Sequence, residues 1–488
     1  MLLGIDLGTQ ALKVLAVDEG FVVRGRALVP IATRHPGPGR VEQDPASWLA
    51  ALRPGIHAAL EDAGACAEDV LGLAVTGQLD GTLAVDCRGQ PLTPALIWMD
   101  RRAVDQLTDI DPALIRQRCG QVADPGHPAA KIRWLLRHHE LPAAPRFHQP
   151  VSFLVEHLTG AFVQDHALAS TSMLYALAAR AWDSELCERF GIDPAWLPGI
   201  AEPDSLAGVV TESGAELSGL VPGTPVAVGT GDDFTAALGA GVTRPGRVLC
   251  CVGTAEIVGA VHDASVIDPD GMVETHGFPG GRYLIENPGW LSGGAVVWLR
   301  ELLAAESFAA LDTLAASAPA GCDGLAFLPT LSGAMAPVWR AEARGALYGL
   351  TPAHGRDHLA RAVLEGTAMA LAEVVDRLDA LGVATDRIRL VGGGARSRIW
   401  TAIRAAATGR PIELVDVEDA ASIGAVACAA VVAGAADSLN TAVERLVRVV
   451  ETIDPDPAEI RAYTEARARS QRLFAALLPL MDRPWTRS

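Results

Sequence analysis

The first 30 residues alternate between short apolar runs and polar breaks, a pattern that predicts β-strands joined by tight turns. Leu2–Asp6 and Lys13–Asp18 are two such runs, and a Gly8-Thr9 step lies between them. We therefore expect a β-hairpin that bends at this step. Val22–Pro30 repeats the apolar pattern and is expected to add a third strand.

The next segments predict a helix and two further strands. Residues 44–64 have a helical pattern, with Asp44 suited to the N-cap and Pro45 to the first helical position. Residues 70–78 and 89–102 each run through apolar positions and end in polar ones. Functional side chains of α/β sheets lie at such strand ends, so both endings are candidate parts of a site.

The second half of the chain repeats the pattern of the first. Residues 221–242 predict a strand, a Gly-rich turn with two aspartates and a helix of small residues. Residues 247–261 then give strand, Gly253-Thr254 and strand again. Residues 388–400 predict a strand that runs into three glycines and a helix. We expect an α/β fold built from two similar halves.

The junction between the halves is expected near residues 243–247. This predicts one domain over residues 1–243 and a second over residues 244–436. The remaining residues, 437–488, are predicted to form a helical tail that packs on the second domain.

Composition narrows the function classes. The chain has 488 residues and a net charge of −18, which argues against nucleic acid as a partner. None of its eight cysteines forms a C-x-x-C pair, so we expect buried, reduced thiols in a cytoplasmic protein. The longest apolar run, residues 420–436, is rich in Ala and Gly and predicts a buried helix rather than a membrane span.

The Gly-Thr bends suggest phosphate binding. A bend without side-chain bulk lets backbone N–H groups approach phosphate oxygens, and Lys13 would add positive charge. Asp6 would repel a phosphate unless a divalent cation lay between them, which implies Mg²⁺ held through water. The alternative is a plain hairpin with an incidental Asp. Two facing bends would clamp one polyphosphate, which favours the functional interpretation.

Common nucleotide loops do not account for this pattern. The sequence contains no G-x-x-x-x-G-K run followed by Ser or Thr, which excludes a P-loop enzyme. The glycines of residues 392–394 follow a predicted strand and suit close backbone approach to an adenine or ribose. The alternative for them is a tight turn from strand to helix.

Five separated segments make the chain similar to the FGGY carbohydrate kinases. They are GIDLGTQALKVLAVD (4–18), GHPAAKIRWLLRHH (126–139), GDDFTAALG (231–239), GALYGLTPAHGRDHLARAVLEG (345–366) and VGGGARSRIW (391–400). The resemblance implies two ribonuclease-H-like domains of the actin-like ATPase fold, with the active site in the cleft between them. It also implies ATP and Mg²⁺ as cofactors and a small-molecule sugar as substrate, and it leaves a homodimer open.

Within that family the chain most resembles the xylulokinases. The segments VEQDPASWLAAL (41–52), ALIWMDRR (95–102) and FLPTLSGAMAP (327–337) are similar to theirs. Two positions depart, because xylulokinases carry His at the position of Asp80 and Asn at that of Asp233. Glycerol kinases carry a carboxylate at the position of Asp80. The expected reaction is phosphorylation of D-xylulose to D-xylulose 5-phosphate.

Two other functions stay open on these grounds. One is the same chemistry on another acceptor, such as ribulose, glycerol or erythritol. The other is a non-catalytic, actin-like regulator that binds ATP. The presence of Asp6, Asp232 and both Gly-Thr bends argues against the regulator.

The resemblance also implies a role for individual residues. Asp232 is the expected general base and Asp233 a hydroxyl acceptor, with reversed roles as the alternative. Asp80 either binds the sugar or caps a turn, and Trp98 either stacks on a sugar or lies in the core. Lys131 is expected in a structural salt bridge. The predicted substrate-binding residues are Gln78, Leu79, Asp80, Trp98, Asp100, Arg101 and Asp233; the cofactor-binding residues are Thr9, Gln10, Lys13, Gly253, Thr254, Gly293, Gly393, Gly394, Ala395 and Arg398; the metal-binding residue is Asp6.

Overall fold

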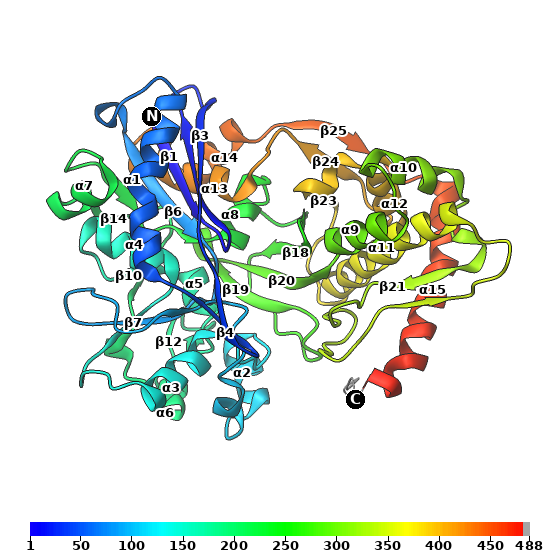
Figure 1. The fold of residues 1–488 in the computed structure, drawn as a ribbon, viewed down its shortest axis with the longest axis horizontal. Coiled ribbons are helices and arrows are strands. Elements are labelled where there is room, and N and C mark those ends of the chain that lie inside the picture. The colour runs from blue at the N-terminus through cyan, green and yellow to red at the C-terminus, as the bar shows by residue number, and fades with distance from the viewer. Residues whose placement is uncertain (482–488) are drawn as a thin grey trace.

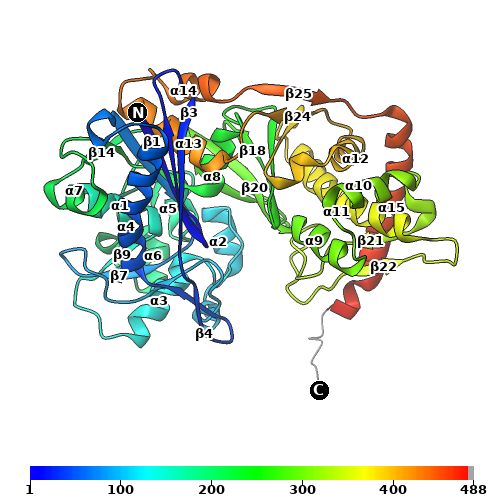
Figure 2. The ribbon, with the colours of Figure 1, turned by 45° about the horizontal axis from the view of Figure 1, so that its top comes forward.

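The computed structural model describes residues 1–481 and contains two large mixed β-sheets, each of seven strands. Figure 1 shows two lobes, one built around each sheet, with α13 (Ala420–Val432) and α14 (Leu439–Leu446) of the second half beside the first sheet. Figure 2, turned by 45°, shows the same two lobes with helices α8 (Asp232–Gly239) and α13 near their junction.

The first sheet contains the predicted N-terminal hairpin. Strand β1 pairs antiparallel with β2 and parallel with β6, and β2 continues antiparallel to β3. The predicted third strand is therefore confirmed. In spatial order the sheet is β14 (Leu206–Val209), β15 (Pro225–Ala227), β6 (Gly72–Gly77), β1 (Leu2–Leu7), β2 (Ala11–Val17) and β3 (Val23–Pro30), with β16 (Thr230–Gly231) also paired to β6.

The second sheet repeats this topology, as the sequence predicts. Strand β17 pairs antiparallel with β18 and parallel with β23, just as β1 pairs with β2 and β6. In spatial order the sheet is β19 (Glu274–Phe278), β20 (Arg282–Leu291), β18 (Ala255–His262), β17 (Arg247–Val252), β23 (Arg387–Val391), β24 (Ile412–Val415) and β25 (Val449–Ile453).

Helices cover the outer faces of both sheets. Helix α1 (Pro45–Asp62) begins as predicted, because the Asp44 side chain accepts a hydrogen bond from the Ala46 N–H and Pro45 is the first helical residue. The other helices of eight or more residues on the outer faces and in the loops are α2 (Pro112–Cys119), α3 (Pro128–His138), α4 (Pro150–Thr159), α9 (Gly293–Leu302), α10 (Phe308–Ser317), α11 (Arg356–Ala380) and α12 (Arg398–Thr408).

Short elements complete the first lobe and the outer part of the second. The small sheets are β4 (Arg34–Gly37), β5 (Arg40–Gln43) and β8 (Ala95–Leu96); β7 (Leu83–Val85) and β9 (Arg146–His148); β10 (Val163–Asp165) and β13 (Gly199–Ala201); β11 (Tyr175–Ala176) and β12 (Ala181–Trp182); β21 (Ala326–Leu328) and β22 (Ala346–Tyr348). The short helices are α5 (His166–Ser170), α6 (Ser184–Phe190) and α7 (Glu212–Ser218).

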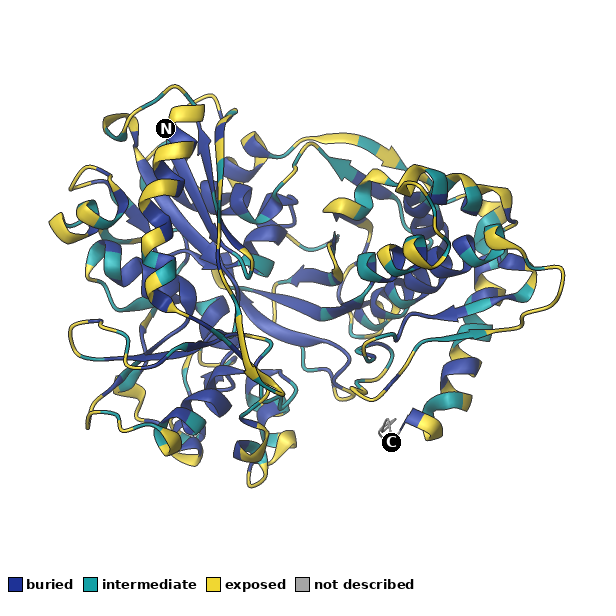
Figure 3. Cartoon of the chain, in the orientation of Figure 1, coloured by how far each residue is buried: buried dark blue, intermediate teal, exposed yellow. Residues whose placement is uncertain are grey.

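Helices α8 and α13 lie at the junction of the lobes and bury small residues against each other. A side chain at Gly239 would overlap the backbone of Ala420, and one at Gly424 would overlap the backbone of Thr235. Their core also contains Leu249 of β17 and Leu2 of β1, so it joins the two sheets. Figure 3 shows both helices as largely buried, which confirms the predicted buried helix in residues 420–436.

Helix α13 lies within the predicted second domain, residues 244–436, and packs against the first sheet. Its contacts there are with β1 and β6. The reason is that it is apolar on all sides and fills the space between two sheets. Within residues 1–481 no helix combines the length and the apolar character needed to cross a membrane.

The C-terminal segment is mixed rather than wholly helical. Helix α14 (Leu439–Leu446) packs on α13, strand β25 joins the second sheet, and α15 (Pro457–Met481) packs on α12. The part of the predicted tail at 482–488 lies outside the described residues. The domain limits at 243 and 436 stay a prediction.

Cysteine placement agrees in part with expectation. All eight cysteines are free thiols, and five of them are buried. Cys66 and Cys87 are exposed, because they lie in surface turns rather than in a core element.

Candidate active site

Each Gly-Thr bend is closed by a hydrogen bond from its glycine N–H, but the second bend is one residue shorter than the first. The Gly8 N–H donates to the Ala11 carbonyl at 3.0 Å, and the Gly253 N–H donates to the Ala255 carbonyl at 2.9 Å. The second bend rests on the start of α9, where the backbone N–H groups on either side of Gly293 donate to the Thr254 carbonyl. Gly293 therefore lies against the predicted phosphate bend.

The first bend carries a partly buried charge cluster. Asp6 is buried, and its Oδ2 lies 3.1 Å from the Lys13 Nζ. The same Nζ lies 2.9 Å from Oδ2 of Asp419, the N-cap residue of α13, which the sequence did not single out. Burial opposes the charge of Lys13, but the two carboxylates raise its pKa. Lys13 thus pairs with two carboxylates, and a contact with phosphate stays a prediction.

Asp6 keeps one oxygen free of protein partners. Its Oδ1 is buried and makes no hydrogen bond with another described residue. Burial raises the pKa of Asp6, and the Lys13 ammonium opposes that shift. A carboxylate oxygen in this position is a suitable acceptor for a cation or for water bound to a cation.

Asp232 and Asp233 are the first two residues of helix α8 and follow strand β16 directly. They were predicted in a Gly-rich turn; the helix begins earlier because Gly231 is already its N-cap. Burial, followed by the charges of Asp233 and Asp6, raises the pKa of Asp232 well above its usual range. Burial, followed by the charge of Asp80, raises the pKa of Asp233 to about 7.

This aspartate pair is not neutralised by the protein. Among the described residues neither Asp232 nor Asp233 forms a side-chain hydrogen bond or ion pair with another side chain. Neighbouring carboxylates repel each other, so both stay ionised only if positive charge offsets the repulsion; otherwise one of them takes up a proton. The helix N-terminus favours negative charge and supplies part of that offset.

Gln78, Leu79 and Asp80 lie at the end of β6, beside these aspartates. The Gln78 Nε2 donates to the Gln43 Oε1 at 2.8 Å, and Gln43 in turn donates to the Thr9 carbonyl at 2.7 Å. Gln43 therefore connects the end of β6 to the first bend; it was missed because nothing marks one Gln in a short strand. The Gln78 Oε1 is buried without a partner, and Leu79 packs into the cores on both sides.

The three residues predicted near the next strand end have different environments. Trp98 is 45% exposed rather than in the core, and its Nε1 donates to the Thr9 Oγ1 at 3.0 Å. Arg101 is exposed and forms an ion pair with Asp124.

Asp100 is fully buried. Its carboxylate forms an ion pair with Arg102 at 2.7 Å and accepts from the Val41 N–H at 2.6 Å. Because its oxygen atoms already contact Arg102 and the Val41 N–H, Asp100 is not among the proposed substrate contacts.

The triple glycine follows β23 and lies against the second bend. Gly392 has a φ of +85°, and a Cβ there would lie 2.6 Å from the carbonyl of Val252, the residue before Gly253. Gly393, Gly394 and Ala395 form a short 3₁₀ turn at this point. Arg398 is exposed and forms an ion pair with Glu451 of β25, and Gln10 is exposed at the first bend.

A row of buried polar residues on β19 and β20 completes the site from the second lobe. Glu274, His276 and Glu286 are all buried, and the His276 Nε2 lies 3.4 Å from the Glu286 Oε1. Burial, followed by the charge of Asp233, raises the pKa of Glu286 well above its usual range. The signal for this row was the alternation of polar residues in VETHGF (273–278), which no motif covers.

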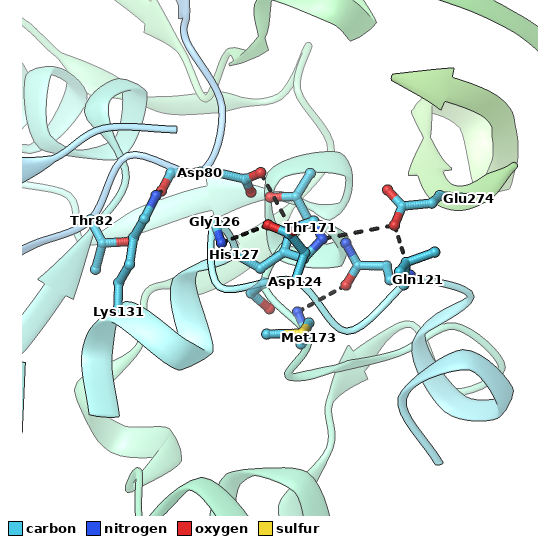
Figure 4. A network of polar contacts seen from close by, with 12 residues as sticks. Asp80, Thr82, Gln121, Asp124, Gly126, His127, Lys131, Thr171, Met173 and Glu274 are labelled. Atoms are coloured by element: carbon cyan, nitrogen blue, oxygen red, sulfur yellow. Dashed lines mark hydrogen bonds and ion pairs between the residues drawn. The ribbon is translucent and has the colours of Figure 1, made fainter. Parts of the chain in front are cut away.

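Lys131 does not form the predicted salt bridge. Its buried Nζ donates to the carbonyl groups of Asp80 at 2.8 Å and Ile97 at 2.9 Å (Figure 4). The reason is that helix α3 aims the side chain at two strand ends whose carbonyl groups have no partner in a ladder.

The donor set suits a phosphate-bound Mg²⁺ ion better than a metal held by protein alone. Within residues 1–481 no three His, Cys, Asp or Glu side chains are arranged to hold a metal ion. The unpartnered Asp6 Oδ1 and the aspartate pair supply oxygen atoms and negative charge, which Mg²⁺ prefers. Phosphate oxygens and water would have to supply the other ligands.

Comparisons with known proteins match both halves of the chain to one family. Residues 1–239 match the N-terminal domain of the FGGY family of carbohydrate kinases, and residues 248–433 match its C-terminal domain. The chain is 29% identical to a xylulose kinase from Escherichia coli, over 99% of this chain and 100% of that protein. It is 32% identical to a glycerol kinase from Aromatoleum aromaticum, over 94% and 95% of the two chains.

Solved structures give the same result. The crystal structure of a xylulose kinase from Rhodospirillum rubrum superposes with a TM-score of 0.90 at 32% identity and covers 99% of both chains. The fold is thus that of the two-domain sugar kinases of the actin-like ATPase type.

Proposed function

Because this chain belongs to the FGGY family of carbohydrate kinases, we propose that it transfers the γ-phosphoryl group of ATP to a hydroxyl group of D-xylulose. Sugar kinase activity of the xylulose or glycerol kinase type follows from the family and its relatives. The choice of D-xylulose rests on the xylulose kinases among those relatives and on the segments of this sequence that resemble them.

The observation that carries the proposal is the aspartate pair at the start of α8, with which no described side chain forms a hydrogen bond or ion pair. The raised pKa of Asp232 suits a general base, because a raised pKa makes the carboxylate a stronger proton acceptor. In the proposed step the acceptor oxygen attacks the γ-phosphorus as its proton passes to an Asp232 oxygen. The bond from phosphorus to the bridging β,γ-oxygen breaks, and ADP leaves.

The acceptor is proposed to lie between Asp232 and the end of β6. Asp80 and the Gln78 Oε1 each keep a buried oxygen without a protein partner, and such oxygens accept hydrogen bonds from sugar hydroxyl groups. Asp233 adds a further acceptor. Leu79, Trp98 and Arg101 would border this space.

The nucleotide is proposed to lie against both bends. Backbone N–H groups at Thr9, Gln10 and Thr254 would face phosphate oxygens, and Lys13 would add positive charge on exchange of a carboxylate partner for phosphate. Gly393, Gly394, Ala395 and Arg398 would border the adenine and ribose. When bound, Mg²⁺ would lie near Asp6 and neutralise phosphate charge during transfer.

A screen of acceptors tests the proposal. ADP release with Mg²⁺ and ATP would be followed for D-xylulose, D-ribulose, glycerol, erythritol and D-gluconate, and the product identified by ³¹P NMR. We expect the highest kcat/KM with D-xylulose. Higher kcat/KM with another acceptor would overturn the substrate but keep the reaction. ATP binding without turnover on any acceptor would favour the regulator instead.

Glycerol is the second candidate, because one specific residue favours it. Asp80 places a carboxylate where glycerol kinases carry one, and its Oδ1 is unpartnered. Glycerol turnover above that of D-xylulose would assign this alternative. A homodimer and a cytoplasmic location stay predictions.

A further inference from the structure

Asp80 is held in an unusual backbone conformation. Its φ of +57° lies in the left-handed region, which a residue other than glycine adopts only when its surroundings impose it. Its N–H donates to the Gln149 Oε1 at 3.0 Å, and its carbonyl accepts from the Lys131 Nζ at 2.8 Å. Both backbone groups of Asp80 are therefore fixed by buried side chains of the first lobe.

The Asp80 side chain has a third fixed contact, with His127. The Asp80 Oδ2 lies 3.3 Å from the His127 Nδ1, while Oδ1 is buried without a partner. His127 precedes α3 and is buried (Figure 4). Burial opposes its charge, but Asp80 and Glu274 raise the pKa of His127 well above its usual range.

The other edge of the same imidazole faces the second lobe. The His127 Nε2 lies 3.8 Å from the Oε1 of Glu274 on β19, and Figure 4 shows the ring between the two carboxylates. Glu274 also accepts from the Val122 N–H at 2.7 Å and lies 3.7 Å from the His276 Nε2. Although burial opposes ionisation, His127 and His276 lower the pKa of Glu274 to about 2.

The contacts of His127 are poorly suited to stability alone. Both exceed a normal hydrogen-bond length, and two ionisable groups, His127 and Glu274, are buried to make them, beside an Asp80 side chain that is 18% exposed. A shorter pair occurs inside the first lobe, where the His148 Nε2 lies 2.7 Å from the Glu156 Oε2. What distinguishes His127 is that its two partners come from different lobes and one of them carries a free oxygen.

We propose that His127 is a positioning residue that holds the Asp80 carboxylate toward the acceptor and links it to Glu274 of the second lobe. The inference rests on the proposed function in one respect, the acceptor contact of Asp80. Acceptor recognition then depends on the placement of β19 relative to the first sheet. ATP recognition does not, since His127 contacts neither bend.

The test compares His127→Gln and Glu274→Gln with the parent protein. The dissociation constants of D-xylulose and glycerol are measured by calorimetry without nucleotide, and the KM values for acceptor and ATP by steady-state kinetics. Removing one partner of a buried ion pair leaves the other charge uncompensated, and about tenfold in binding is a modest share of that cost. We expect each variant to weaken acceptor binding about tenfold and to leave the KM for ATP within twofold.

Two further variants separate positioning from general damage. The double variant should weaken acceptor binding no more than either single one, because both remove the same link. His166→Gln is the matched control, since His166 also lies near a carboxylate, Glu202, at the junction of the lobes but does not contact Asp80. It should leave the dissociation constant of the acceptor unchanged.

Each outcome is decisive. Unchanged acceptor binding in both single variants, an equal rise in the KM for ATP, or an additive double variant would overturn the inference. Acceptor binding by the parent without turnover would overturn the proposed function and leave the inference to be judged on the dissociation constants. If the parent binds neither acceptor, Asp80 has no acceptor to hold and the inference fails.

Discussion

The two Gly-Thr hairpins have the same topology and different chemistry. In both, an antiparallel pair bends at Gly-Thr, and the first strand runs parallel to the next strand of its sheet. The second cross-strand pair from the bend differs between the two hairpins. In the first hairpin this pair is Asp6 and Lys13, whereas in the second it is Cys251 and Ile257.

The second hairpin carries an acidic residue next to its bend, Glu256, but this residue belongs to the core. Glu256 faces away from solvent and forms a fully buried ion pair with Arg404, with Oε2 and Nη2 2.7 Å apart. Both halves of the chain therefore contain a hairpin of the same topology, but only the hairpin of the first half carries a charged pair next to its bend. The second hairpin offers N–H groups; the first offers N–H groups, a carboxylate and an ammonium.

The largest effect on the rate is expected from substitution of Asp232, the proposed general base. Asp232→Asn keeps the shape of the side chain but removes the proton acceptor. General bases contribute about 10²–10⁴ in rate, and a loose transition state favours the lower end. We expect kcat to fall by about 10²-fold or more, with both KM values little changed, as measured by steady-state kinetics.

Asp233→Asn is the matched control for that variant. It installs the residue that xylulokinases carry, so kcat with D-xylulose should stay within tenfold of the parent. A dead Asp233→Asn and an active Asp232→Asn would reverse the two roles. If both retained activity, the base would lie elsewhere.

The next effect compares matched positions of the two hairpins. Asp6→Asn should lower kcat/KM for ATP about 10–100-fold and raise the Mg²⁺ concentration needed for half activity, as groups that act on a metal through water typically do. Cys251→Ser, at the corresponding position of the second hairpin, should change neither value more than twofold. A Mg²⁺ titration of both variants checks this, and equal responses would remove the proposed asymmetry.

A smaller effect is expected from the feature that the hairpins share. A Cβ at Gly8 or Gly253 meets no atom closer than 3.4 Å, so the fold accepts Ala at either position. Each substitution should still raise the KM for ATP about tenfold, because it holds a phosphate away from charged hydrogen bonds. Gly199→Ala, which has similar room on β13, is the control. A change at only one bend would disprove a symmetric clamp.

The smallest effect concerns the stability of the protein without ligands. The pKa of Asp233 is raised to about 7, so the folded state holds its proton up to that pH while the unfolded state loses it near pH 4. Stability is therefore lost as pH rises from about 4 to about 7. Asp233→Asn should raise Tm by a few degrees at pH 8 and not at pH 4, measured by thermal unfolding.

The sign of that change is the informative part. An equal gain in Tm at pH 4 and pH 8 would mean that ionisation of Asp233 does not destabilise the folded protein. A loss at pH 8 would mean that the carboxylate is stabilised, against the raised pKa.

Local patterns in the sequence were sufficient for much of the fold. The repeated strand, Gly-Thr and strand pattern gave both hairpins, and Asp44-Pro45 gave the start of α1. These features depend on residues that are close in sequence, and such residues are also close in space whatever the tertiary fold. The family followed from motifs of the same local kind.

Only those residues of the candidate site that stand at a predicted strand end or helix start could be predicted from the sequence. Asp6, Asp80, Asp232 and Asp233 stand at strand ends or helix starts, and the structure brings them together. Asp100 stands at a similar ending, yet Arg102 and the Val41 N–H take its carboxylate. Sequence cannot distinguish the two cases, since the partner of a carboxylate is set by packing.

What the tertiary structure alone decided are the contacts between distant segments. Helix α13 lies between two strands of the second sheet in sequence, β24 and β25, but packs on the first sheet, because an all-apolar helix lowers its free energy most between two sheets. His127 meets Asp80 and Glu274 only because α3, β6 and β19 converge at the junction of the lobes. The sequence by itself determined the elements and the family, for which neighbouring residues suffice; the folded chain decided which charges meet, because that depends on distances across the core.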